Sequence, residues 1–133
     1  MTAAATLFGV SVARLLAAIA AVESDNGRTS GNVYQLQRVY LDDVGRIYGC
    51  HFEDAVATDR HASEEVILAY WRHYGERYRR QTGRQPTAEV LARIHNGGPD
   101  GWRKPATEGY WRKVKAVMEG ADTPKNNQKG KPQ

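Results

Sequence analysis

Apolar residues recur at helical spacing in five separate segments of this chain, and no segment keeps up the alternation typical of a β-strand. In the segment 11–24 the apolar positions follow an i, i+3, i+4, i+7 pattern, namely Val12, Leu15, Leu16, Ile19 and Val22. The same spacing predicts helices over 34–48, from Ser63 onward, over 87–95 and over 107–120. The sequence therefore predicts a mainly α-helical domain of about five helices.

Capping and breaking residues indicate where these helices begin and end. Ser63, Thr87 and Thr107 have the side chains that N-caps prefer, so we expect them to start the last three helices. The run Asn96-Gly97-Gly98-Pro99 is the strongest break in the chain. Residues 27–32 and 50–62 are expected to be irregular, with one short helical turn in the second stretch.

The size of the chain and its cysteine content define how it must be stabilised. The 133 residues suit a single domain, and Cys50 is the sole cysteine, so an intramolecular disulfide is impossible. An apolar core must hold the fold. We expect one domain over residues 1–120 and a disordered basic tail over 121–133, where nothing apolar follows Ala121.

The formal net charge is +4, which favours anionic partners such as nucleic acid, a membrane surface or a bacterial wall. A nucleic-acid interface would use the arginines of the third helix: Arg77, Arg79, Arg80 and Arg84. The aromatic residues of the same helix (Trp71, Tyr74 and Tyr78) share one helical face and are better explained as core. We therefore expect no nucleic-acid partner.

The apolar stretch 15–22 could be taken for a targeting signal. It is too short to span a membrane, Arg14 interrupts the apolar run, and no Lys or Arg precedes Phe8. We interpret it as a core helix, and we expect neither a clear signal peptide nor a transmembrane segment.

Glu23 lies at the end of an apolar stripe, four residues after Ile19 and seven after Leu16. A carboxyl group there would face the core or a cleft floor, and desolvation would raise its pKa. A raised pKa suits a general acid that works near neutral pH. The alternative is a residue in a fraying last turn, with its side chain in solvent, and spacing alone leaves both open.

Other residues could take part in binding. The Asn96–Pro99 turn could bring backbone and an amide close to a sugar, or could be an unoccupied turn between helices. Tyr110 and Trp111 could contact a buried acid and a sugar face, or could belong to the core. The four histidines (His51, His61, His73 and His95) show no metal-ligand spacing, and no phosphate-binding or other cofactor motif is present. We expect no metal and no cofactor.

Four short motifs, in order along the chain, resemble those of lysozyme-like enzymes. Ala20–Ser24 resembles the Glu-Ser end of the catalytic helix in goose-type lysozymes and soluble lytic transglycosylases, and Gly31–Leu36 resembles the strip that follows it. Ala92–Gly101 is similar to the ARIHNGGPxG run of invertebrate-type (destabilase-like) lysozymes. Thr107–Trp111 matches their T-x-x-YW motif.

The resemblance implies an activity and a set of site residues. Glu23 would protonate the glycosidic oxygen between N-acetylmuramic acid and N-acetylglucosamine in peptidoglycan. Tyr110 would hydrogen-bond near Glu23 and steady the developing oxocarbenium ion. The residues that would bind the glycan are Ser24, Tyr34, Gln35, His95, Asn96, Gly97 and Gly98.

The resemblance also has a gap after Glu23. Only ten residues separate Glu23 from Tyr34, so the small β-hairpin usual there is expected to be reduced or absent. Asp25 is the candidate second carboxylate, although it follows Glu23 by only two residues. Hydrolysis, lytic transglycosylation and a catalytically inactive glycan-binding module all stay open. A peptidoglycan substrate places the action outside the cytoplasm, whether secreted, periplasmic or phage-delivered, and the oligomeric state stays open.

Overall fold

The structure is a computed structural model that describes residues 6–120, so the tail expected over 121–133 lies outside the described residues. It contains five α-helices, which are α1 (Val12–Ser24), α2 (Arg38–Tyr48), α3 (Arg60–Thr82), α4 (Ala88–Gly97) and α5 (Glu108–Met118). Three short 3₁₀ helices are η1 (Asp54–Thr58), η2 (Gly101–Arg103) and η3 (Pro105–Thr107). Two short strands, β1 (Thr6–Leu7) and β2 (Val10–Ser11), form one hairpin. The mainly α-helical fold predicted from the sequence is confirmed.

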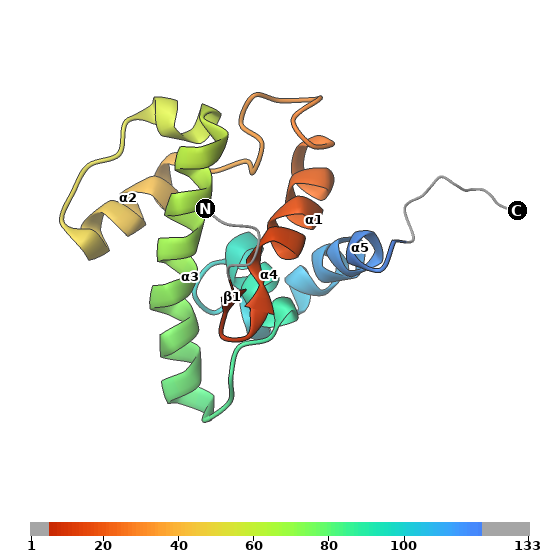
Figure 1. Ribbon diagram of the computed structural model, residues 1–133. Helices are drawn as coiled ribbons and strands as arrows, with labels where there is room; N and C mark the ends of the chain where they lie inside the picture. Colours follow the sequence, from red (N-terminus) through yellow and green to blue (C-terminus); the bar gives the residue numbers. More distant parts are fainter. Residues whose placement is uncertain (1–5, 121–133) are drawn as a thin grey trace, which may run out of the picture.

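Helix α4 is the centre of the domain. It packs against α1, α3 and α5, and Figure 1 shows it between the long α3 on one side and α1 and α5 on the other. Six consecutive residues of α4, 90–95, are buried. A helix that is buried around its whole circumference has no solvated face, so its polar side chains need partners inside the protein.

Arg93 of α4 is 8 % exposed and is satisfied by three groups. Its Nε donates to Thr107 Oγ1 at 2.7 Å, its Nη1 to Glu89 Oε2 at 2.7 Å, and its Nη2 to the Lys104 carbonyl at 2.9 Å. Thr107 in turn donates to the Gly101 carbonyl at 2.7 Å. These bonds tie the 98–107 segment to the centre of the fold, and they set where α5 begins.

The aromatic face of α3 belongs to the core, as predicted. Trp71 is 0 % exposed, and Tyr74 and Tyr78 are 7 % and 6 % exposed. The Trp71 indole Nε1 donates to the Leu91 carbonyl of α4 at 2.8 Å, so this buried donor is satisfied.

Two helices begin at other residues than predicted. Helix α2 starts at Arg38 rather than at 34, and Gln35, in the segment before it, has the left-handed backbone conformation (φ 55°) that a helix cannot include. Helix α3 starts at Arg60 because Asp59 is its N-cap, accepting from the Ala62 amide at 3.0 Å. Ser63, the predicted cap, lies inside α3 and donates instead to the Val56 carbonyl at 2.9 Å.

Thr107 occupies the predicted N-cap position of α5, but its hydroxyl makes no capping bond. The hydroxyl is engaged with Arg93 and Gly101 instead, as described above.

A hairpin that was not predicted from the sequence lies before α1. Strands β1 and β2 are antiparallel, with Thr6 opposite Ser11. The turn uses positive φ angles at Phe8 (54°) and Gly9 (79°). Strands of two residues carry no readable alternation, which is why the sequence pattern missed them. The segment between α1 and α2, where a reduced or absent hairpin was expected, contains no strand.

No helix among residues 6–120 is long and apolar enough to cross a membrane.

The close approach of η2 to α4 requires glycine at position 101. A Cβ added to Gly101 would lie 2.1 Å from the Arg93 carbonyl oxygen, and this neighbour is backbone and cannot swing away. We expect Gly101→Ala to lower the free energy of unfolding by about 2–3 kcal/mol, as overpacking does in other cores. Urea denaturation measures this.

Gly31→Ala is the matched control, because a Cβ there meets nothing within 4 Å. Equal stability of the two variants would contradict the packing argument.

Candidate functional site

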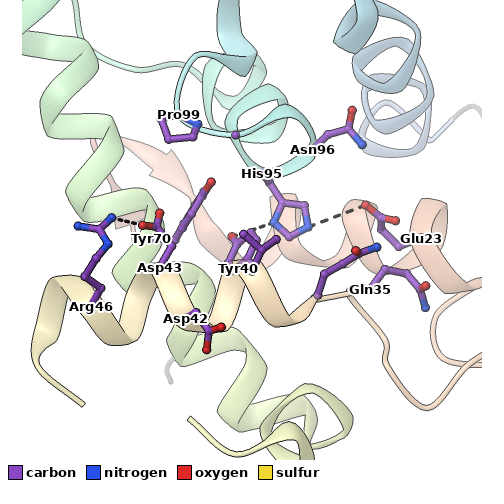
Figure 2. Close-up of a pocket in the computed structure, with 13 residues that line it drawn as sticks. Glu23, Gln35, Tyr40, Asp42, Asp43, Arg46, Tyr70, His95, Asn96 and Pro99 are labelled. Carbon is purple, nitrogen blue, oxygen red and sulfur yellow. Dashed lines mark hydrogen bonds and ion pairs between the residues drawn. The ribbon is translucent and has the colours of Figure 1, made fainter. Parts of the chain in front are cut away.

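A cleft of about 830 Å³ runs between α2 and the C-terminal end of α4. Figure 2 shows Glu23 at one end of the cleft and Arg46 at the other. It is lined by Glu23, Gln35, Gln37, Val39, Tyr40, Asp42, Asp43, Arg46, Tyr70, His95, Asn96, Gly98 and Pro99. Its size is typical of a ligand-binding cleft.

Glu23 is in the last turn of α1, and its side chain is 18 % exposed. The Tyr110 hydroxyl of α5 donates to Glu23 Oε2 at 2.9 Å. Burial raises the pKa of the Glu23 carboxyl, and the Tyr110 hydrogen bond partly opposes that rise by stabilising the carboxylate. Glu23 is therefore a partly buried acid in a cleft wall, and not a solvated residue of a fraying turn.

His95 of α4 lies beside Glu23 and is 3 % exposed. Its Nε2 is 3.8 Å from Glu23 Oε2, and its Nδ1 is 3.0 Å from the Tyr40 hydroxyl of α2. Burial lowers the pKa of His95 to about 4, against the smaller opposing effect of a backbone hydrogen bond with Tyr34. The imidazole is thus neutral at physiological pH.

Aromatic rings form one wall of the cleft. Tyr40 stacks on Tyr70 with ring centroids 4.0 Å apart and an interplanar angle of 21°. Tyr70 meets Tyr74 edge-on at 4.8 Å. The Tyr74 hydroxyl donates to Asp43 Oδ2 at 2.5 Å, and Asp43 also pairs with Arg46.

None of the α2 residues of this wall was among the site residues predicted from the sequence. The available signal was an Asp-Asp pair two residues after a tyrosine on an amphipathic helix, which is common on ordinary solvated helices.

The structure brings four of the predicted binding residues to the cleft with Glu23, namely Gln35, His95, Asn96 and Gly98. Asn96 is exposed, and within residues 6–120 its side-chain amide has no hydrogen-bond partner. The Gln35 amide Nε2 donates to the Asn32 carbonyl at 2.7 Å. The Asn96 amide is therefore free to bind a ligand, whereas the Gln35 amide is already hydrogen-bonded within the protein.

Two predicted binding residues are buried away from the cleft. Ser24 is 1 % exposed, and its hydroxyl donates to the Val33 carbonyl at 2.7 Å and accepts from the Gly27 amide at 2.8 Å. Tyr34 is 2 % exposed and donates to Glu64 at 2.6 Å. Both side chains hold the segment between α1 and α2 in place, so they support the site without lining it.

Asp25, the candidate second carboxylate, does not line the cleft. It is the left-handed C-cap of α1, its side chain is 62 % exposed, and it pairs with Arg28 at 3.3 Å. The other carboxylates of the cleft, Asp42 and Asp43, pair with arginines of their own helix.

Packing and backbone conformation explain why glycines occur in the 96–101 turn. A Cβ at Gly97 would lie 2.5 Å from Thr107 Cγ2, and Gly98 has φ +91°, a conformation that favours glycine. Gly97 therefore serves packing, whereas the backbone of Gly98 borders the cleft.

No group of three or more His, Cys, Asp or Glu residues in the described part of the chain is arranged to hold a metal ion.

The lowered pKa of His95 makes stability depend on pH. Between pH 6.5 and about 4 the unfolded chain takes up a proton at this position and the folded protein does not, so stability falls as pH falls. The shift corresponds to a loss of up to about 3 kcal/mol. Urea unfolding at several pH values measures it.

His95→Gln cannot titrate in this range, so its stability should fall less steeply with pH than that of the wild type. Identical pH dependence of the two proteins would contradict a neutral, buried His95.

Comparison with known proteins gives relatives named lysozymes. Invertebrate-type lysozyme 6 of Caenorhabditis elegans is 38 % identical over 98 residues, which cover 70 % of this chain and 70 % of that protein. Lysozyme of Meretrix lusoria is 31 % identical over 118 residues, or 82 % of this chain and 92 % of that protein. Lysozyme 1 of Crassostrea virginica is 38 % identical over 92 residues, but the match spans only 47 % of its length.

No family model matches the chain. The relatives nevertheless cover most of the described domain, and two of them are matched over more than two thirds of their own length. The resemblance seen in the sequence motifs is confirmed, and the chain belongs to the invertebrate-type lysozyme family.

Proposed function

We propose that this protein is a glycosidase that cleaves the β-1,4 bond between N-acetylmuramic acid and N-acetylglucosamine in peptidoglycan, with Glu23 as general acid. One observation carries the proposal: a partly buried carboxyl group with a raised pKa faces a cleft of ligand size. Membership of a family whose members are named lysozymes supports the choice of substrate.

The hydrogen bond at Glu23 determines which of its two carboxyl oxygens can donate a proton. Tyr110 donates to Oε2, and Oε1 has no hydrogen-bond partner among residues 6–120. In the protonated acid the transferable hydrogen would therefore reside on Oε1. As the bond between the sugar C1 and the glycosidic oxygen breaks, that oxygen keeps the electron pair and takes this proton. An oxocarbenium-like sugar is left.

The rest of the cleft binds the glycan in this proposal. The free amide of Asn96 and the exposed amide of Gln35 would bind sugar hydroxyl and N-acetyl groups. The Gly98 backbone would lie beside the bound glycan. Tyr110 would keep Glu23 oriented while positive charge develops on the sugar.

The second step has two candidates. A water could attack C1, as in hydrolysis, or the 6-hydroxyl of the muramic acid could attack and form a 1,6-anhydro product. In both cases the attacking oxygen forms a bond to C1 and its proton returns to the Glu23 carboxylate. The exposed position of Asp25 and its pairing with Arg28 favour the second route, since Asp25 is poorly placed to activate a water near Glu23. An inactive glycan-binding module would share the cleft but would not need the acid.

Glu23→Gln removes the proton donor and keeps the shape of the side chain. We expect solubilisation of purified peptidoglycan to fall by roughly 10²–10⁴-fold, the usual contribution of general acid catalysis. Circular dichroism should show an unchanged fold.

Glu53→Gln is the matched control, because it makes the same chemical change at a side chain that is 83 % exposed. It should keep full activity. An active Glu23→Gln variant would remove Glu23 from the proposed role, and a wild type without activity would favour the binding module.

The products distinguish the two routes for the second step. We expect fragments ending in 1,6-anhydromuramic acid, which are lighter than the hydrolytic products by the mass of one water. Mass spectrometry of the digest measures this. Fragments with a reducing muramic acid end would instead establish hydrolysis, and Asp25→Asn would then show whether Asp25 contributes.

A further inference from the structure

Tyr40 of α2 and His95 of α4 form a chain of contacts that leads along the cleft to Glu23. The Tyr40 hydroxyl contacts His95 Nδ1 at 3.0 Å, and His95 Nε2 faces Glu23 Oε2 at 3.8 Å (Figure 2). The second distance is too long for a hydrogen bond, so the interaction between His95 and Glu23 is electrostatic. The proposed acid step does not use either residue.

The partner of Nδ1 determines which ring nitrogen carries the proton. The Tyr40 hydroxyl has no other hydrogen-bond partner among residues 6–120, and a buried hydroxyl proton needs an acceptor. If Tyr40 donates to Nδ1, the neutral imidazole must carry its hydrogen on Nε2. That N–H then lies on the side of the ring that faces Glu23.

We propose that Tyr40 and His95 are positioning residues for Glu23: Tyr40 selects the His95 tautomer, and the Nε2–H dipole of His95, 3.8 Å away, acts electrostatically on the same Glu23 oxygen to which Tyr110 donates. The Tyr110 hydrogen bond and the imidazole dipole both favour negative charge on Oε2, so the transferable proton stays on Oε1. The inference rests on the proposed function only for its consequence in catalysis, because the coupling itself is a property of the free protein.

The groups around Glu23 come from four helices. Tyr110 faces it from α5, His95 from α4 and Tyr40 from α2, while α3 contributes Tyr70 behind Tyr40. The charged residues of the cleft, Asp42, Asp43 and Arg46, are on α2. His95 also has a hydrogen bond with the Tyr34 backbone, so its effect on Glu23 is that of a nearby dipole and not of a hydrogen bond. In the described part of the chain it is the one imidazole dipole at Oε2, and it should stabilise the carboxylate form of Glu23.

A carboxyl ¹³C NMR titration of Glu23 tests the coupling. His95→Phe removes the N–H while keeping a ring in the buried site, so the pKa of Glu23 should rise by roughly 0.5–1 unit. His95→Gln restores an N–H donor near the Nε2 position and should return the pKa toward that of the wild type. A merely structural role of His95 would not produce this reversal.

Tyr40→Phe provides the milder variant, because it keeps the ring that stacks on Tyr70 and removes only the hydroxyl. We expect a smaller rise in the pKa of Glu23, since the tautomer is no longer selected. Tyr74→Phe is the matched control. It removes a hydroxyl that is bonded to Asp43, and it should leave the Glu23 titration unchanged.

An unchanged or lowered Glu23 pKa in Tyr40→Phe would overturn the proposal, even if His95→Phe did not fold. The titration needs no substrate, so it also separates the two proposals. Shifted titrations in a protein without activity would leave the coupling in place and refute the proposed function. In an active enzyme, the alkaline limb of the rate profile should move with the Glu23 pKa.

Discussion

The fold and the site both depend on the burial of α4 around its whole circumference. Six consecutive buried residues place Arg93 inside the protein, where its guanidinium must be fully satisfied. The bonds from Arg93 to Thr107 and to the Lys104 carbonyl fold the 98–107 segment back onto α4. That segment leads into α5, and α5 carries Tyr110 to Glu23. A buried cation at the centre of the domain therefore determines the geometry at Glu23, the proposed general acid.

Desolvation is the main cause of the pKa shifts of both Glu23 and His95 in the cleft. It disfavours charge, so it raises the pKa of Glu23 and lowers that of its neighbour His95. The acid is thereby kept protonated to higher pH, while the imidazole stays neutral and does not form a strong ion pair with it. A cationic His95 would stabilise the carboxylate and weaken Glu23 as an acid. Burial of both residues together thus favours the protonated form of Glu23, which can act as a proton donor.

Sequence patterns predicted the helices well and the loops poorly, for physical reasons. Helical spacing reports burial, so the five helices and the α3 aromatic core could be read directly. The start of α3 could not, because Asp59 and Ser63 are both good cap residues and tertiary contacts at Ser63 decide between them. At the site, Glu23 could be predicted because it lies at the end of the apolar stripe of α1. The supporting role of Ser24 depends on the path of the loop backbone, and the α2 wall depends on how helices pack, and neither has a local signature.

If Glu23 is the proton donor, the rate of glycan cleavage follows the fraction of Glu23 that is protonated. The most direct measurement compares kcat/KM on peptidoglycan as a function of pH with the NMR titration of Glu23 in the free protein. Our account predicts that the midpoint of the alkaline limb coincides with the pKa of Glu23, and that this pKa lies above its ordinary value. A rate that stays constant while Glu23 loses its proton would contradict the account.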